Sequence, residues 1–347
     1  MSKRSASFRP RGISRREFIK LAAMAGLLAG CGPIGQPVVT PAPTATPTKA
    51  PPPTPSVPNK VVHTHHAGVW SGDDLVTGAL RQMLDASITK LTGLDDATAA
   101  WASLFDPGER IAIKINTINT SDFWTHMPLV VAVTERLQET GVPAEQIVIF
   151  DRATSEMKGA GYTINQDGPG VRCHGTDRKY SGGWTVMETD VGLSDILMNC
   201  DALINMPILK VHTHSGVTFA MKNHFGTFDR PGSFHRPRTG PAIVELNALA
   251  PIRDRTRLII GDALEVSPVC MGAWVRAVTG DSILMSFDPV AHDTVGLQVL
   301  GEVMRASGEG NPAAATDLAS AWLEKAAELG LGTNNPDNIE LVEVSLG

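Results

Sequence analysis

Cysteine is scarce in this 347-residue sequence, and the few cysteines stand far apart. The four are Cys31, Cys173, Cys200 and Cys270, and no two of them form a C-x-x-C pair. This spacing excludes a ferredoxin-type iron–sulfur motif and a short zinc knuckle, because both need closely spaced thiolates. A disulfide among the last three stays open, since wide spacing defines no pairing.

Glycine-rich phosphate loops are also lacking, although glycine itself is common with 33 residues. No G-x-G-x-x-G follows a predicted strand, and G-x-x-x-x-G-K does not occur. The sequence therefore gives no indication of the usual dinucleotide or P-loop sites.

Basic residues are fewer than acidic residues over most of the chain. Residues 1–30 hold seven Lys or Arg and one Glu, so the remainder has 23 basic and 35 acidic residues, a net charge of −12. A chain with this balance is not expected to bind nucleic acid. It is also not expected to bind a membrane through a polybasic surface.

The N-terminal segment carries export signals but no long apolar run. Ser14 to Lys20 reads S-R-R-E-F-I-K, a twin-arginine pattern. The apolar stretch from Leu21 to Gly30 is ten residues, whereas a spanning helix needs about 20. It therefore predicts a signal peptide over residues 1–30. Leu28 to Cys31 resembles a bacterial lipobox, which implies cleavage before Cys31 and lipidation of its thiol. We expect an exported lipoprotein of the cell membrane, facing the periplasm or the cell exterior.

A proline-rich tether follows, from Gly32 to Asn59. It holds ten of the chain's 24 prolines, with Thr, Ala and Val between them. Such a composition packs no core and favours extended polyproline II, so it predicts a linker between the lipid and a folded domain.

From Lys60 to Gly347 the pattern predicts one α/β domain, with a mostly parallel sheet and helices on both faces. Arg110 to Asn116, His126 to Thr140 and Ile147 to Phe150 read as strand, helix and strand, the order of a parallel crossover. Residues 152–200 are Gly-rich and irregular, and predict an inserted lobe or lid. The other expected strands are 61–65, 202–209, 257–260, 283–286 and 339–346, and the other expected helices are 72–91, 241–249, 288–304 and 313–329.

The central stretch runs from Asp201 to Phe228, where an apolar run gives way to polar side chains. Ala202 to Leu209 is nearly all apolar and predicts a strand buried on both faces. Ligands bind at the carboxyl ends of strands in open α/β sheets, so polar residues just beyond this strand are site candidates. Those residues are Lys210, His212, His214, Thr218, Lys222, Asn223 and His224.

Beyond Gly216 a four-residue spacing predicts a helix. Val217, Met221 and Phe225 would form its apolar stripe. Its polar stripe would carry His214, Thr218 and Lys222. The alternative is that Lys222 is an ordinary solvated helix lysine.

Histidines recur at i, i+2 spacing, which puts both rings on one side of an extended segment. His212 with His214, and His63 with His65, show this spacing. We take His212, His214 and His65 as candidate ligands of a divalent metal. The alternative is that the histidines of the first strand face solvent.

Further candidates lie at other strand ends. Lys114 and Asn116 end the strand that begins at Arg110, and Asp262 follows Arg257 to Ile260. Asp288 precedes Pro289, which suffices to explain it as a helix N-cap. Asp293 reads as an exposed helix acid.

A polar loop follows the central stretch. Residues 229–238 contain His235 and three arginines, a composition that could clamp an anion or simply be solvated.

The domain resembles the domain-of-unknown-function 362 family, whose members are often twin-arginine lipoproteins of bacteria. The resemblance rests on IAIKIN from Ile111, on His126-Met127-Pro128, on LINMPILKVHTHSGVTFAMKNHFG from Leu203, on SFDPVAHDTVGLQVLG from Ser286, and on GLGTNNPDNIELVEV from Gly330. It marks Lys114, Asn116, Lys210, His212, Thr218, Lys222, Asn223 and Asp288. Some relatives carry ferredoxin-type cysteines; this chain lacks them, so no such cluster is expected.

Three lysines in one pocket would favour an anionic small molecule. One hypothesis is an enzyme, assisted by a metal, and the other is a non-catalytic protein that binds an anionic metabolite or cofactor. The predicted catalytic residues are Lys114, Lys210, His212 and Lys222; the predicted ligand-binding residues are Asn116, Thr218, Asn223 and Asp262.

Overall fold

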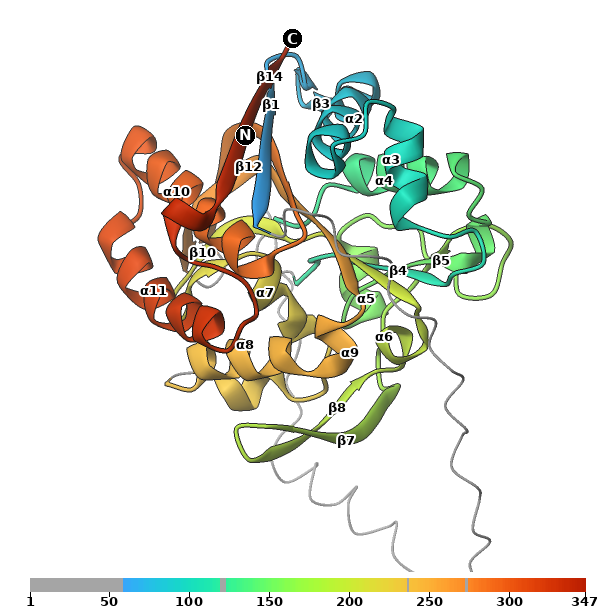
Figure 1. Cartoon of the computed structure of the whole chain (residues 1–347). Helices are drawn as coiled ribbons and strands as arrows, with labels where there is room; N and C mark the ends of the chain where they lie inside the picture. Colours follow the sequence, from blue (N-terminus) through green and yellow to red (C-terminus); the bar gives the residue numbers. More distant parts are fainter. Residues whose placement is uncertain (1–58, 119–122, 236, 272–273) are drawn as a thin grey trace, which may run out of the picture. The chain divides into compact units, whose positions relative to one another are not determined.

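The computed structural model describes residues 59–118, 123–235, 237–271 and 274–347. These residues form a sheet with helices on both faces (Figure 1). The predicted signal peptide, Cys31 and all but the last residue of the predicted tether lie outside the described residues. No described helix combines the length and the apolarity that a membrane span requires.

The central sheet has ten strands among the described residues, in the order β14-β1-β13-β12-β9-β4-β5-β6, with β10 and β11 continuing beside β12. Most neighbours are parallel, whereas β13 runs antiparallel to both β1 and β12. The predicted α/β class with a mostly parallel sheet is confirmed. The strands are β1 Lys60–His66, β4 Ile111–Lys114, β5 Ile147–Phe150, β6 Arg172–Cys173, β9 Ala202–Asn205, β10 Ile208–His212, β11 Gly216–Thr218, β12 Thr256–Met271, β13 Trp274–Ser286 and β14 Glu340–Leu346.

Both faces of the sheet are covered because its strands are apolar on both sides. Along β4, Ile111 and Ile113 belong to one core and Ala112 to the other, as period-two alternation requires. The first core is closed by α2 Thr77–Thr92, α3 Ala97–Leu104 and α4 Met127–Glu139. The second is closed by α7 Ala220–Asn223, α8 Thr239–Ala248, α9 Ala250–Arg253, α10 Pro289–Ser307 and α11 Pro312–Glu328.

The Gly-rich insertion contains short elements of its own. They are α5 Thr154–Gly159, β6, the hairpin β7 Tyr180–Val186 with β8 Thr189–Ser194, and α6 Asp195–Asn199. Met187 and Glu188 turn this hairpin with positive φ angles of 46° and 60°. The Ser194 amide donates to the carbonyl of Thr227 at 2.8 Å, so the hairpin is fixed to the chain just beyond α7.

The structure divides the predicted strand 202–209 in two. β9 ends at Asn205 and β10 begins at Ile208, with Met206 and Pro207 between them. Proline lacks the N–H that a central ladder needs. The carbonyl of Pro207 instead accepts from the Asp262 amide at 2.8 Å, which directs the chain along β12.

The helix predicted after Gly216 is wrong over its first turn. Gly216, with φ of 78°, turns the chain into β11, which pairs back on β10. Only Ala220–Asn223 is α-helical, followed by the 3₁₀ turn His224–Gly226. Thr218 of β11 therefore lies directly opposite Lys210 of the neighbouring strand β10. It does not lie one helical turn before Lys222, as the sequence predicted.

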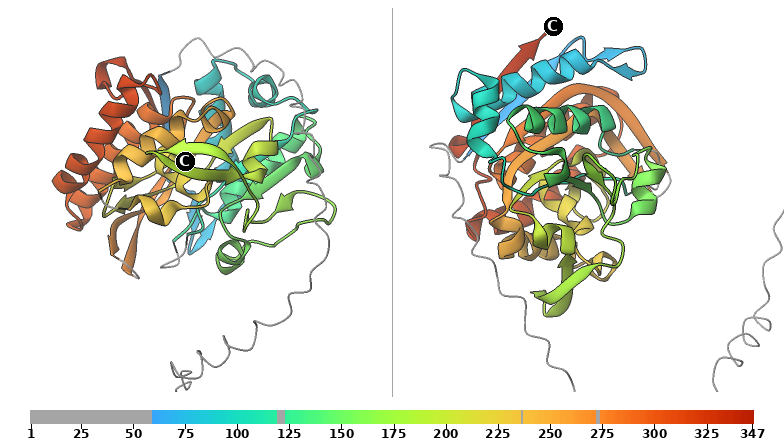
Figure 2. Two further views of the ribbon diagram at one scale, coloured as in Figure 1. Left: turned by 90° about the horizontal axis from the view of Figure 1, so that it is seen from below. Right: turned by 90° about the vertical axis from the view of Figure 1, so that its right-hand side faces the viewer.

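Two other boundaries differ from the prediction. The helix expected from Gly72 begins at Thr77, because Trp70–Ser71 and Asp74–Leu75 form a small hairpin, β2 and β3. Asp262 does not end a strand, since β12 continues to Met271. Figure 2 shows β12 and β13 as a long curved pair in orange. Asp262 is instead level with Ile208 at the start of β10, three residues past Ile259, which pairs with the last residue of β9, Asn205.

Phe219, just before α7, packs between two glycines. A Cβ at Gly261 of β12 would lie 2.2 Å from Phe219 Cζ, and one at Gly296 of α10 would lie 2.4 Å from Phe219 Cδ1. Both glycines are therefore required by close packing. Together they fix the position of the Phe219 ring, which directly precedes α7.

We expect Gly296→Ala to lower the free energy of unfolding by about 1–3 kcal/mol, because the new methyl overlaps Phe219. Gly301→Ala in the same helix is the matched control: its Cβ would meet only the flexible end of Arg305, at 3.4 Å. The control should be neutral or about 0.5–1 kcal/mol more stable, since alanine favours helix. Urea unfolding of both variants measures the difference. Equal stability of the two would contradict the packing described.

Candidate functional site

A buried ion pair stands at the ends of β4 and β5. Lys114 Nζ lies 2.7 Å from Asp151 Oδ1, and both side chains are almost completely buried. The same ammonium donates to the carbonyl of Ile115 at 2.6 Å and to Asn223 Oδ1 at 3.3 Å. Burial lowers the pKa of Lys114, although the Asp151 carboxylate favours the charged form.

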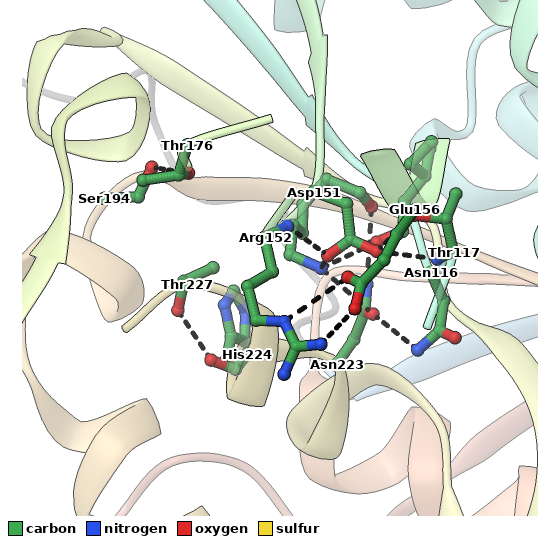
Figure 3. A network of polar contacts seen from close by, with 12 residues as sticks. Asn116, Thr117, Asp151, Arg152, Glu156, Thr176, Ser194, Asn223, His224 and Thr227 are labelled. Carbon is green, nitrogen blue, oxygen red and sulfur yellow. Dashed lines mark hydrogen bonds and ion pairs between the residues drawn. The ribbon is translucent and has the colours of Figure 1, made fainter. Parts of the chain in front are cut away.

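Asp151 is held by further donors, as Figure 3 shows. Its Oδ2 accepts from the amide of Thr117 at 2.6 Å and from the Thr117 hydroxyl at 2.8 Å. Its Oδ1 accepts from the amide of Arg152 at 2.8 Å. A Cβ at Gly226 would lie 2.5 Å from Asp151 Oδ1 and 2.6 Å from Lys114 Nζ. Only glycine allows the chain after α7 to approach the pair this closely.

Side-chain amides connect this pair to neighbouring strands. Asn223 Oδ1 accepts from Asn116 Nδ2 at 3.1 Å, and Asn223 Nδ2 donates to Asn205 Oδ1 at 2.7 Å. Asn116 Oδ1 in turn accepts from Lys210 Nζ at 3.2 Å. The predicted residues Lys114, Asn116, Lys210 and Asn223 are thus joined in one hydrogen-bonded network.

Lys222 occupies a different environment from the other two lysines. It is only 7% exposed, and its Nζ lies 3.5 Å from the centroid of the Phe225 ring. Among the described residues it forms no ion pair and no hydrogen bond through Nζ. Burial, with Lys210 and Lys114 nearby, lowers the pKa of Lys222 to about 7. Its amine is therefore partly neutral at physiological pH.

Three histidines gather beside Lys222. The ring centroids of His212 and His214 lie 5.6 Å apart, and that of His235 lies 6.4 Å and 5.8 Å from them. Burial, together with Lys222 and the other histidines, lowers the pKa of His212 to about 2, so this imidazole is neutral. His235 is exposed, whereas His212 and His214 are partly buried, so solvent reaches the cluster at His235.

His224 is buried behind the network. Asn205 Nδ2 lies 3.3 Å from His224 Nε2, so this ring nitrogen is the acceptor and Nδ1 carries the hydrogen. Nδ1 has no hydrogen-bond partner among the described residues. Burial, with a contribution from Lys114, lowers the pKa of His224 to about 3.

Asp293 positions the site helix and is not the exposed helix acid that the sequence predicts. It is completely buried, and its carboxylate accepts from the amides of Ala220 at 2.7 Å and Met221 at 2.9 Å. These are the first amides of α7, so Asp293 of α10 caps the helix that carries Lys222. Asp293 lies on the buried face of α10, so the apolar spacing of that helix could have indicated from the sequence that this acid is buried.

The predicted metal set is brought together only in part, because His212 and His214 are neighbours and His65 lies elsewhere in the sheet. Among residues 59–118, 123–235, 237–271 and 274–347 there is no group of three or more His, Cys, Asp or Glu that could hold a metal ion. His65 lies on β1, and β13 and β12 separate that strand from β10. Its ring is 3.9 Å from Asp281. His63 pairs with Glu343 of β14.

The remaining candidates have structural roles or partners elsewhere. Asp288 caps α10 by accepting from the amides of Val290 and Ala291, both at 2.8 Å. Cys173 and Cys200 are buried free thiols. The predicted ligand residue Thr218 is buried opposite Lys210.

Asp262 belongs to a second polar cluster, centred on His126. Its Oδ2 accepts from the amide of His126 at 2.7 Å and lies 2.8 Å from His126 Nδ1, while Glu265 Oε2 lies 3.2 Å from Nε2. Burial opposes a charge on the ring, but the two carboxylates outweigh it and raise the pKa of His126 to about 10. His126 is therefore an imidazolium at neutral pH.

The two clusters are neighbours in the fold. Asn116 donates through its amide to Thr125 Oγ1 at 2.9 Å, and Thr125 precedes His126 in the chain. Sequence reasoning missed Asp151, Asn205 and Glu265 as members of these clusters. The first two had a signal, since Asp151 directly follows a strand and Asn205 is the polar exception in an apolar run.

The comparison with protein-family models finds one match. The model described as "Domain of unknown function (DUF362)" matches residues 111–298, more than half of the chain and including every residue of the Lys114 network. No curated protein matches the chain.

Two solved structures are similar in outline. One is the lactate racemase apoprotein from Thermoanaerobacterium thermosaccharolyticum, with 9% identity and a TM-score of 0.42; the match covers 68% of this chain and 55% of that one. The other is a structural genomics target from Thermotoga maritima, with 12% identity and a TM-score of 0.39; the match covers 75% and 60%. The chain thus spans little more than half the length of either protein.

The raised pKa of His126 predicts how stability depends on pH. Because the folded pKa of about 10 lies above the ordinary value of 6.5, the contribution of the ion pair is complete below pH 6.5 and is lost as pH rises through about 10. Asp262→Asn should remove this dependence and lower stability at pH 7 by about 3 kcal/mol, since it leaves a buried charge with a weaker partner.

The control is Glu343→Gln, which removes the carboxylate from the exposed His63 pair and should cost at most about 1 kcal/mol. Urea unfolding between pH 6 and 10, with NMR titration of the imidazoles, measures both effects. A His126 ring that titrates near pH 6.5 in the unmodified protein would contradict the description.

Proposed function

The chain belongs to the domain of unknown function 362 family, and we propose that it binds an anionic small molecule beside Lys222. The supporting observation is the Lys222 ammonium, which is buried next to Lys210 and Lys114 and has no carboxylate within ion-pairing distance among the described residues. Buried charges in proteins are paired. A phosphate or carboxylate group on a ligand would supply the missing partner.

The surrounding side chains fit such a ligand. The Lys114 charge is matched by Asp151, whereas Lys222 has no such carboxylate among the described residues, so a ligand anion is expected at Lys222. His212 is close by, and its neutral imidazole can donate one hydrogen bond to an anion oxygen. Access would be from the side of His235, which is exposed.

Ligand binding should be coupled to protonation of Lys222. The free amine has a pKa of about 7 because burial and two cations disfavour its charge. An anion placed against it would favour the ammonium and raise that pKa. Binding therefore takes up a proton at neutral or higher pH.

The same pKa favours a second candidate function, an enzyme in which the neutral Lys222 amine accepts a proton from the bound ligand. This role needs no metal. A measured pKa of Lys222 near the ordinary value of 10.5 would remove this candidate, because the amine would then be protonated at neutral pH.

We expect inorganic phosphate to raise the melting temperature of the domain and to bind most tightly below pH 7. Above the Lys222 pKa the affinity should fall by up to about tenfold per pH unit, because one proton must be taken up. Lys222→Met should abolish the effect. Calorimetric titration in buffers of different ionisation enthalpy measures both affinity and proton uptake.

Two controls separate lost binding from lost folding. Lys325→Met changes an exposed lysine of α11 and should bind phosphate as the unmodified protein does. Lys222→Met should be at least as stable as the unmodified protein without phosphate, since it replaces a desolvated cation by an apolar chain of similar length. Unchanged phosphate binding in a folded Lys222→Met protein would contradict the proposal.

We further propose that the protein acts as an exported lipoprotein, anchored through Cys31 in the cell membrane. The twin-arginine pattern, the lipobox resemblance and the proline-rich tether support this, in that order along the chain.

Cys31→Ser should move the full-length protein from the membrane fraction to the soluble fraction in a bacterial host with twin-arginine export, and should abolish incorporation of labelled fatty acid. Cys173→Ala, which changes a thiol inside the domain, is the control and should remain lipidated. If the Cys31→Ser protein still incorporates labelled fatty acid and stays in the membrane fraction, lipidation at Cys31 is disproved.

A further inference from the structure

A cavity lies apart from the lysine network. It has a volume of about 550 Å³ and is lined by Ala67, Trp70, Gly72, Asp73, Phe123, Trp124, His126, Glu265, Thr279 and Asp281. None of these residues belongs to the Lys114 network or the histidine cluster. The volume falls in the range of small-molecule sites, about 300–1,000 Å³.

The walls of this cavity are unusually aromatic for this chain. Trp70, Phe123 and Trp124 are three of its ten lining residues, whereas aromatic residues make up 5% of the sequence. Trp70 packs edge-on against His126, with ring centroids 5.7 Å apart and an interplanar angle of 77°. This contact fixes the indole at the cavity wall.

The charge of the cavity is negative. His126 is its one cationic lining residue, and that charge is already matched by the buried Asp262 at 2.8 Å. Three lining carboxylates add negative charge: Asp73, Asp281 and Glu265, the last of which also contacts His126 Nε2 at 3.2 Å. The Glu265 and Asp281 side chains are 35% and 28% exposed, so both can reach a ligand in the cavity. Asp281 Oδ2 also lies 3.9 Å from His65 Nε2.

We propose that this cavity binds an organic cation, a quaternary ammonium or protonated amine carried on a small apolar body. Aromatic faces attract such cations through their quadrupoles, and carboxylates add charge complementarity. A metal ion fits less well, because the described residues hold no group of three or more carboxylates, imidazoles or thiols that could bind one. The site is distinct from the anion site at Lys222 and does not depend on it.

The test compares choline with 3,3-dimethylbutan-1-ol, its neutral isostere, by tryptophan fluorescence and calorimetry. Choline should bind saturably and the alcohol at least about tenfold more weakly, because only choline gains the cation–π and carboxylate contacts. Choline affinity should also fall as salt is raised. Equal binding of the two, or no saturable binding of choline, overturns the proposal.

Two variants locate the ligand. Trp70→Leu removes an aromatic wall, and Asp281→Asn removes a partly exposed carboxylate whose loss leaves the core intact. Each should weaken choline about fivefold or more while leaving phosphate binding unchanged. Controls are Trp184→Leu on β7 and Glu324→Gln on α11, which should bind choline normally.

The outcomes separate this proposal from the others. Choline binding that survives both Trp70→Leu and Asp281→Asn, or calcium binding in place of choline, overturns it. Loss of phosphate binding in Lys222→Met leaves it untouched, so the two sites fail independently. Folding of each variant is checked by its melting temperature, and Asp281→Asn decides the result if Trp70→Leu does not fold.

Discussion

The ion pair between Lys114 and Asp151 is the contact on which the candidate site depends. It joins the ends of β4 and β5 and, through Asn223, the end of α7. A buried pair of this kind is costly to break, because either partner alone would be an uncompensated charge. Glycine at position 226 is a consequence, since any side chain there would overlap both members.

Charge is separated between two neighbouring regions of the fold. Lys210 and Lys222 lie on one side, with the neutral His212 imidazole, and the His126 cavity on the other carries an excess of carboxylates. Thr125 links them through its contact with Asn116. A molecule that carries both an anionic group and an ammonium group would match both regions, although each is proposed on its own observations.

The sequence allowed the sheet, its two helical layers and four members of the Lys114 hydrogen-bond network to be predicted, because apolar periodicity and strand ends are local signals. It did not show the break at Pro207 or the β11 hairpin, since Val217 and Met221 fit both a helix stripe and a strand followed by a short turn. Asp293 and His65 were misjudged for another reason. Whether a helix acid is buried, or whether two H-x-H pairs meet, depends on contacts between distant segments that spacing alone does not define.

The titration of Lys222 tests the central claim most directly. NMR of the protein with labelled lysine, assigned by comparison with Lys222→Met, gives the pKa of this amine with and without phosphate. The account predicts a pKa of about 7 in the free protein and a clear rise when phosphate is bound. A value near 10.5 under both conditions would show that the ammonium is solvated or already paired, and would contradict an anion site at Lys222.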